Sequence, residues 1–445
     1  MLSKEDNELL CRVGPGTLMG DVMRQYWLPA MLSSELPAPD SDPLRVMLLG
    51  EQLIAFRDSN GKVGLLANNC PHRGASLFFG RNEEAGMRCV YHGWKFSVDG
   101  TCLDMPNPHY GRASEPAESD FRTRVKAAAY PCQERGGIVW TYMGPRADPP
   151  PLPDLEPNML PDGEWTISIY QRECNWMQAL EGDIDTCHTV FLHTGSLTED
   201  DAPDGSWAKY ALAERAPRYE VVTTDAGVMY TAYRPAETDS IYYRIAQFLF
   251  PFYAMVPTGV LGLDVRVRAW IPMDDHHTLA LTMARPGARG ATTSWSPLNM
   301  TEAVPNSTGW FDRFRCVANG GNDYQIDREA QRTNASYTGI PSIYLQDQAV
   351  TESMGPIYKR WEEHLGTSDA MIIRTRRRLI DAAKALREQG TLPPGAEDST
   401  VYAVRSGGVV LPRGQNWVES TSELRKAFVD HPGLSREVLG GIPAV

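Results

Sequence analysis

The chain has 445 residues, of which 42% are apolar and 22% charged, and its formal net charge is −13. This composition is typical of a globular protein, and the length suits two domains better than one core. The negative charge argues against binding to nucleic acid or to an anionic membrane surface. The first residues are charged from Lys4 onward and lack an apolar segment, so we expect no secretory signal and a cytoplasmic protein.

Three parts are expected along the chain. Residues 1–43 should begin with a short helix, since Ser3 and Asp6 form a weak capping signal, and should pack on the large third part. In residues 44–145, short alternating strands and turns such as Asp99-Gly100 predict a small antiparallel β domain. A stiff linker with seven prolines spans residues 144–163.

The third part, 146–445, mixes two kinds of pattern. Strand patterns occur around 219–233, 242–250, 265–270 and 277–283, and helical patterns at 175–188, 347–365 and 369–388. We therefore expect an α+β protein, with a central antiparallel sheet flanked by helices in this part. The longest apolar run, 248–263, contains two prolines and is too short to cross a bilayer.

Two motifs in the β domain each combine one cysteine with one histidine. They are Cys70-Pro71-His72 and Cys89-Val90-Tyr91-His92, and sixteen residues separate His72 from Cys89. Two cysteines and two histidines form the ligand set of a Rieske [2Fe–2S] cluster, in which two imidazoles replace two thiolates on one iron. Gly74 and Gly93 follow the two pairs, where the backbone must turn tightly and direct N–H groups at sulfur.

A structural zinc site would use the same residue types. Zinc fingers, however, space their ligands as two pairs that each contain one residue type. Here both pairs are mixed and the first has a single intervening residue, so the cluster is the favoured interpretation. The six other cysteines are scattered along the chain, and we expect them to stay reduced.

A second candidate site lies in residues 175–193. His188 and His193 are five residues apart, which on a regular helix leaves them about 140° out of register. They can converge on one ion only if the helix ends or bulges between them. Two histidines and one carboxylate form the facial triad of non-haem Fe(II) oxygenases. Spacing does not select the carboxylate, because the chain has 56 acidic residues.

Taken together, these motifs resemble those of the Rieske non-haem iron oxygenases, in their aromatic-ring-hydroxylating branch. The similarity is closest to the phthalate 4,5-dioxygenase-like oxygenase components and covers nearly the whole chain. The stretches that carry it are 8–13, 70–77, 91–96, 178–182 and 345–347, with Asp185, His188 and His193 at the family spacing.

The resemblance nominates two roles at the second site. Asp347, at the expected start of a helix, would be the third ligand of a mononuclear Fe(II), and Asp323 and Asp327 are rivals. Asp185 would not bind the iron. It would bridge His188 to a cluster histidine, His92, of a neighbouring subunit in a homotrimer or in stacked trimers.

The resemblance also implies a reaction and partners. The chain would be a terminal oxygenase that takes electrons from a separate NADH-dependent reductase with flavin and a [2Fe–2S] cluster. It would use O2 to cis-dihydroxylate a phthalate-like or substituted benzoic acid. Hydroxylation or O-demethylation of a methoxylated or phenoxy aromatic acid is the alternative. A carboxylate substrate needs a fixed cation, and Arg234 and Arg244 are candidates on the expected strands, with Arg218 as a third.

Two other function classes stay open. The chain could be a Rieske electron-transfer protein whose large domain only binds a partner, or more remotely a zinc hydrolase that uses the same triad. A pure electron carrier does not need two histidines and a carboxylate for a second metal, which favours the oxygenase. The glycine-containing segment 14–20 resembles a dinucleotide loop only superficially, since no strand precedes it and Pro15 interrupts it.

Overall fold

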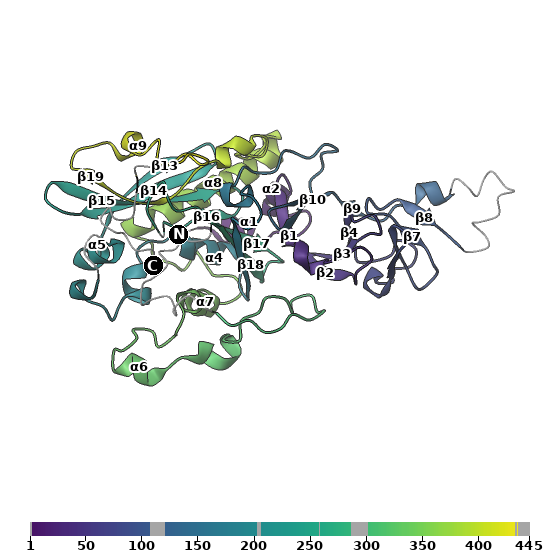
Figure 1. The fold of residues 1–445 in the computed structure, drawn as a ribbon, viewed down its shortest axis with the longest axis horizontal. Helices are drawn as coiled ribbons and strands as arrows, with labels where there is room; N and C mark the ends of the chain where they lie inside the picture. The colour runs from purple at the N-terminus through teal and green to yellow at the C-terminus, as the bar shows by residue number, and fades with distance from the viewer. Residues whose placement is uncertain are drawn as a thin grey trace.

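The computed structural model describes residues 2–106, 121–202, 206–257, 259–285, 301–431 and 434. In Figure 1 a small β domain extends to one side of a large domain in which helices surround a sheet. This architecture confirms the expected α+β class. Within the described ranges, no helix is long and apolar enough to cross a membrane.

The β domain consists of two four-stranded antiparallel sheets. Alternating apolar side chains such as Ile54 and Phe56 fill the core of this domain. The carboxylate of Asp58 closes the turn to the next strand, because it accepts hydrogen bonds from the N–H groups of Asn60 and Lys62. One sheet has the order β2 (Leu44–Leu48), β3 (Glu51–Arg57), β4 (Val63–Ala67) and β9 (Ala129–Tyr130), and the other β5 (Arg81–Glu83), β6 (Gly86–Arg88), β7 (Lys95–Phe96) and β8 (Cys102–Asp104).

The N-terminal segment and the end of the β domain meet in a third sheet. It has the order β1 (Trp27–Leu32), β11 (Ile138–Tyr142) and β10 (Cys132–Arg135). Helices α1 (Lys4–Cys11) and α2 (Leu18–Met23) precede it, and the Ser3 hydroxyl accepts a hydrogen bond from the N–H of Asp6, as a cap should. Both helices pack on helix α8 of the large domain.

The large domain is built on one long antiparallel sheet. The expected strand at 219–233 is two strands, because a tight turn closed by Thr224 and Gly227 divides it. The strands are β12 (Thr166–Arg172), β18 (Thr278–Ala284), β17 (Arg266–Pro272), β16 (Tyr253–Met255), β15 (Ser240–Leu249), β14 (Gly227–Pro235) and β13 (Arg218–Thr223) in sheet order, with β19 (Gly407–Pro412) paired to β15.

Two helix boundaries differ from the sequence expectation. The helix expected at 347–365 spans 343–353, since Gly355 has a φ of +87° and a proline follows it. The helix expected at 175–188 already ends at Asp183. The helices of this domain are α4 (Trp176–Asp183), α5 (Trp207–Ala213), α6 (Arg328–Arg332), α7 (Ile343–Ser353), α8 (Ala370–Gln389) and α9 (Trp417–Ser420).

A buried ion cluster joins several of these helices. Glu181 of α4 accepts hydrogen bonds from Arg360 at 2.9 Å and from Arg376 of α8 at 2.6 Å. Arg376 also pairs with Glu363, and Arg360 reaches Asn7 of α1 at 3.1 Å. Burial alone would raise the pKa of Glu181, but the two guanidinium groups lower it to about 2. The cluster thus fixes α4, the helix that leads into Asp185 and His188.

We expect Arg360→Met to lower the apparent free energy of unfolding by about 3–5 kcal/mol at pH 7, because Glu181 stays buried without its main partner. The folded pKa of Glu181 is depressed, so the cluster contributes fully above the ordinary pKa near 4.5 and loses its contribution as the pH falls toward 2. The loss measured by chemical denaturation should therefore be smaller at pH 4 than at pH 7. Arg81→Met, which removes a pair with an exposed arginine, is the control and should cost less than about 1 kcal/mol. Equal losses in the two variants would contradict this account.

Candidate functional site: two metal centres and a cavity

Two loops of the β domain repeat the same backbone geometry. In each, the glycine four residues after the cysteine donates its N–H to the cysteine carbonyl at 2.9 Å, Gly74 to Cys70 and Gly93 to Cys89. Each cysteine N–H donates at 2.8 Å to the carbonyl of the residue after that glycine. The glycines have φ of +75° and +80°, a region that side chains rarely adopt. Each tight loop therefore presents one thiol and one imidazole.

The four side chains of these loops converge. Cys70 and Cys89 are buried, and the rings of His72 and His92 lie 4.5 Å apart between centroids. Burial raises the pKa of the Cys70 thiol to about 11, although the backbone N–H of His72, which faces its sulfur, acts to lower it. Nδ1 of His72 is buried and has no hydrogen-bond partner among the described residues. Two adjacent thiols and an orphaned imidazole nitrogen fit a [2Fe–2S] cluster.

The second centre lies in the large domain. Nε2 of His188 is 3.1 Å from Nε2 of His193, and Oδ1 of Asp347 is 3.5 and 3.2 Å from these two atoms. Three donors at about 2.1 Å from one metal are separated by about 3.0–3.4 Å for octahedral or tetrahedral angles. The three side chains therefore fit one metal ion and leave positions on its other side open. Asp323 and Asp327 are not part of this group.

The histidines converge because the backbone between them is not an α-helix. Oδ1 of Asp185 accepts a hydrogen bond from the N–H of Cys187 at 2.7 Å, and this local turn interrupts the helix after α4. The π-helical turn η4 (Thr189–His193) follows. A π-helix bonds residues five apart, so it places side chains with that spacing on one face. Asp347 lies one turn inside α7, which packs against η4.

Charges and hydrogen bonds support this centre. Oδ2 of Asp185 faces Nδ1 of His188 at 3.4 Å, and Gln346 contacts Nδ1 of His193 at 2.8 Å. Burial alone would lower the pKa of His188, but Asp185 and Asp347 raise it. Burial would raise the pKa of Asp347, and the two histidines hold it well below its ordinary value. The surroundings of Asp347 therefore keep its carboxyl group ionised, which is the form that binds a metal ion.

A cavity of about 480 Å³ opens beside the three donors, within the range of small-molecule sites. Its walls come from strands and helices that are far apart in the sequence, so a local sequence pattern cannot identify the residues that line it. Beyond the donors, the described lining includes Gly182, Asp183, Asp185, Trp207, Arg244, Arg266, Arg268, Arg285 and Tyr344.

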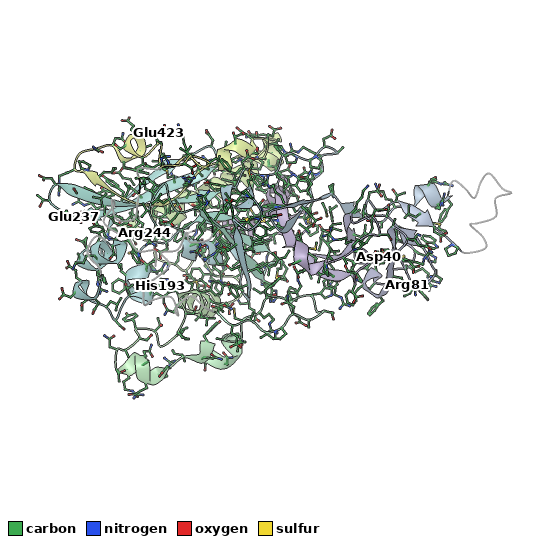
Figure 2. All side chains as sticks on the ribbon, viewed as in Figure 1. Asp40, Arg81, His193, Glu237, Arg244 and Glu423 are labelled. Carbon is green, nitrogen blue, oxygen red and sulfur yellow. The ribbon has the colours of Figure 1, made fainter. Side chains whose placement is uncertain are left out.

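The two candidate arginines occupy different positions. Arg244 lines the cavity, and Figure 2 shows it in the same part of the molecule as His193. Its guanidinium lies 4.7 Å from the centroid of the Trp207 ring and donates long hydrogen bonds to the Pro257 carbonyl and the Thr189 hydroxyl, at 3.3 and 3.4 Å. Arg234 is buried and does not line the cavity. The third candidate, Arg218, is exposed at the edge strand β13.

Comparisons with known proteins identify two family domains in this chain. Residues 26–117 match the family described as Rieske [2Fe-2S] domain, and residues 141–436 match the family described as LigXa C-terminal domain like. The chain is 45% identical to the 3-chlorobenzoate-3,4-dioxygenase oxygenase subunit of Comamonas testosteroni, over 94% of this chain and 97% of that protein. It is 37% identical to the phthalate 4,5-dioxygenase oxygenase subunit of Pseudomonas putida, over 94% of each.

The chain belongs to the Rieske non-haem iron oxygenases. The resemblance stated from the motifs is thereby confirmed, and the cofactors are a Rieske [2Fe–2S] cluster and a mononuclear iron. The crystal structure of dicamba monooxygenase bound to 3,6-dichlorosalicylic acid shares the fold, with a TM-score of 0.53 and 18% identity over 82% of this chain and 99% of that one.

The two metal centres should be separable by mutation. We expect Asp347→Ala to lose the mononuclear iron and to keep the cluster, because the cluster ligands lie in another domain. Iron per chain and the visible absorption of the cluster measure the two centres independently. Asp327→Ala removes the cap of α6 and serves as the control, which should retain all its iron. Full iron content in Asp347→Ala would exclude this residue as a ligand.

Proposed function

We propose that this oxygenase is a terminal component that uses O2 and external electrons to cis-dihydroxylate an aromatic carboxylate of the benzoate or phthalate type. The observation that carries the proposal is the position of Arg244, a buried cation in the wall of the cavity that also contains His188, His193 and Asp347. The names of the two relatives, which refer to 3-chlorobenzoate and phthalate, support an aromatic acid.

The energetics of Arg244 favour an anionic ligand. In the described part of the chain, no carboxylate pairs with this side chain, and its two hydrogen bonds are long. A buried guanidinium without a counter-charge is costly, and a carboxylate can bind its planar fork through two hydrogen bonds. Arg268, by contrast, already pairs with Asp183 at 2.6 Å. Arg244 is therefore the cavity arginine that we assign to the substrate carboxylate.

The positive charge of Arg234 supports the assignment of Arg244 to the substrate carboxylate. Its two terminal nitrogens are buried without hydrogen-bond partners in the described residues. Burial, followed by the charge of Arg244, lowers the pKa of Arg234 to about 10. Two neighbouring buried cations raise the positive potential on this side of the cavity. We propose that Arg234 favours anionic substrates without touching them.

Electrons must reach the mononuclear site from outside the large domain. When bound, the cluster supplies an electron and the ferrous ion supplies the position at which O2 reacts. Segment 14–20 follows helix α1 and not a strand, so it does not have the context of a dinucleotide loop. We propose a separate NADH-dependent reductase with flavin and a [2Fe–2S] cluster as the electron donor.

A head-to-tail ring, in the simplest form a homotrimer, would join the two centres of different chains. In Figure 1 strand β7, which follows His92, lies at the far end of the molecule from α7, and Figure 2 shows Arg81 and His193 well separated. Val90 and Tyr91 are more than half exposed beside the cluster loop, and Phe191, Val350 and Met354 are exposed around the mononuclear site. We take these exposed apolar side chains as parts of the two surfaces that would meet in the ring. We propose that Asp185 links His188 to His92 of the neighbouring copy.

We expect Asp185→Asn to retain both metals and to lose nearly all turnover that is coupled to the cluster. The amide keeps the shape of the carboxylate but cannot carry its charge between the two imidazoles. Metal content, cluster absorption and the rate of substrate-dependent cluster oxidation test this expectation. Asp183→Asn is a useful comparison, since Asp183 also lines the cavity but pairs with Arg268. Undiminished cluster oxidation in Asp185→Asn would rule out the bridging role.

We expect Arg244→Met to weaken binding of the preferred aromatic acid by about 100-fold, equivalent to ~2.7 kcal/mol, because the carboxylate loses its buried partner. The affinity for the corresponding neutral amide should change much less. Arg285→Met is the control, since this arginine lines the cavity but is partly exposed. Titrations with benzoate, 3-chlorobenzoate and phthalate, and with their amides, provide the comparison. An equal loss for acid and amide would contradict the role of Arg244.

A further inference from the structure

A buried glutamine lies directly beside the iron carboxylate. Gln346 precedes Asp347 in helix α7 and is 5% exposed. Its side chain bridges two groups, since Oε1 is 2.8 Å from Nδ1 of His193 and Nε2 is 2.8 Å from the carbonyl oxygen of Ile340. Both distances are typical of good hydrogen bonds. Two neighbouring residues of one helix thus contact the same imidazole from different sides.

The contact with Ile340 determines the direction of both hydrogen bonds. A backbone carbonyl can only accept, so the amide nitrogen of Gln346 must face Ile340 and its oxygen must face His193. The imidazole therefore donates through Nδ1–H. In a neutral imidazole the proton on Nδ1 leaves Nε2 with a free lone pair. This is the nitrogen that lies 3.2 Å from Oδ1 of Asp347.

The Nδ1 atoms of His188 and His193 face different side chains. Nδ1 of His188 faces the carboxylate of Asp185, whereas Nδ1 of His193 faces a neutral amide. A carboxylate makes an imidazole more electron-rich, and an amide fixes its orientation without adding charge. The side chain of His193 is also the more buried, at 6% exposed against 22% for His188.

We propose that Gln346 is a positioning residue that holds His193 in the tautomer and orientation needed to bind the mononuclear iron. The two proposed iron histidines would then have different supports: Asp185 would connect His188 to the electron path, and Gln346 would fix the orientation of the His193 ring. The proposal rests on the iron site of the family and not on the identity of the substrate. It therefore stands or falls independently of the aromatic-acid assignment.

Helix α7 offers a matched control two residues away. Gln348 is equally buried and donates a hydrogen bond to Glu352 at 2.8 Å, but it does not contact His193. Gln346→Met and Gln348→Met remove the same functional group from the same helix and retain a side chain of similar length. Both variants should lose stability, whereas only Gln346→Met should affect the bound iron.

We expect Gln346→Met to release iron to a ferrous chelator about 10–100-fold faster than the wild type, with its cluster absorption intact. Gln348→Met should stay within about twofold of the wild type. The EPR spectrum of the nitrosyl complex of the ferrous site should change in Gln346→Met alone. Equal iron release from both variants would show that only the stability of α7 matters, and unchanged release and EPR in Gln346→Met would also overturn the proposal.

A measurement on the wild type tests the hydrogen bond between Gln346 and His193 directly, and it can be made even if Gln346→Met does not fold. With Co(II) in place of the mononuclear iron, each bound imidazole should give one shifted, exchangeable N–H signal in the NMR spectrum. We expect the His193 signal to exchange slowly with solvent, because its proton is buried and bonded to Gln346. Rapid exchange of both signals would contradict the hydrogen bond.

Discussion

The π-helical turn between His188 and His193 is the constraint on which the oxygenase site depends. A regular helix would point these imidazoles in different directions, and one metal could not bind both. The turn brings their Nε2 atoms within 3.1 Å of each other, and α7 then adds Asp347 at a matching distance. The carboxylate of Asp185 creates the turn that precedes it and also faces His188. One side chain therefore links the local backbone geometry to the proposed electron path.

Two polar side chains of α4 support this site through buried hydrogen bonds. Glu181 holds α4 through two buried arginines, and Gln178, one turn earlier, donates to the backbone carbonyls of Thr351 and Gly355. These contacts tie α4 to α7, the two helices that carry the donors or lead into them. Buried hydrogen bonds of this kind impose one register, because an unpaired buried polar group is costly. The cavity wall is different: Arg244 has no carboxylate partner among the described residues, which is the basis for the proposed anionic substrate.

The two metal centres differ in how far the sequence predicts them. The proposed cluster ligands lie in two short loops whose residue types, spacing and glycines predict the site without knowledge of the fold. The mononuclear site joins segments about 150 residues apart, so the choice of Asp347 required a resemblance to a family. The spacing of His188 and His193 makes their convergence depend on a break or bulge in the helix, but it does not predict the π-helical turn that provides it. Gln178 and Glu181 are polar residues for which the sequence gives no buried partner, and the structure shows them as buried contacts of α4.

The most direct test is anaerobic single turnover of the photochemically reduced, iron-replete protein with a panel of aromatic acids, followed by addition of labelled O2 and mass spectrometry. We predict that one acid makes oxidation of the cluster substrate-dependent and yields a cis-diol with two labelled oxygen atoms. One labelled atom, with formaldehyde released, would assign the chain to the O-demethylating alternative. No product, with a cluster that reoxidises at a rate indifferent to every acid, would contradict the proposed oxygenation of an aromatic carboxylate.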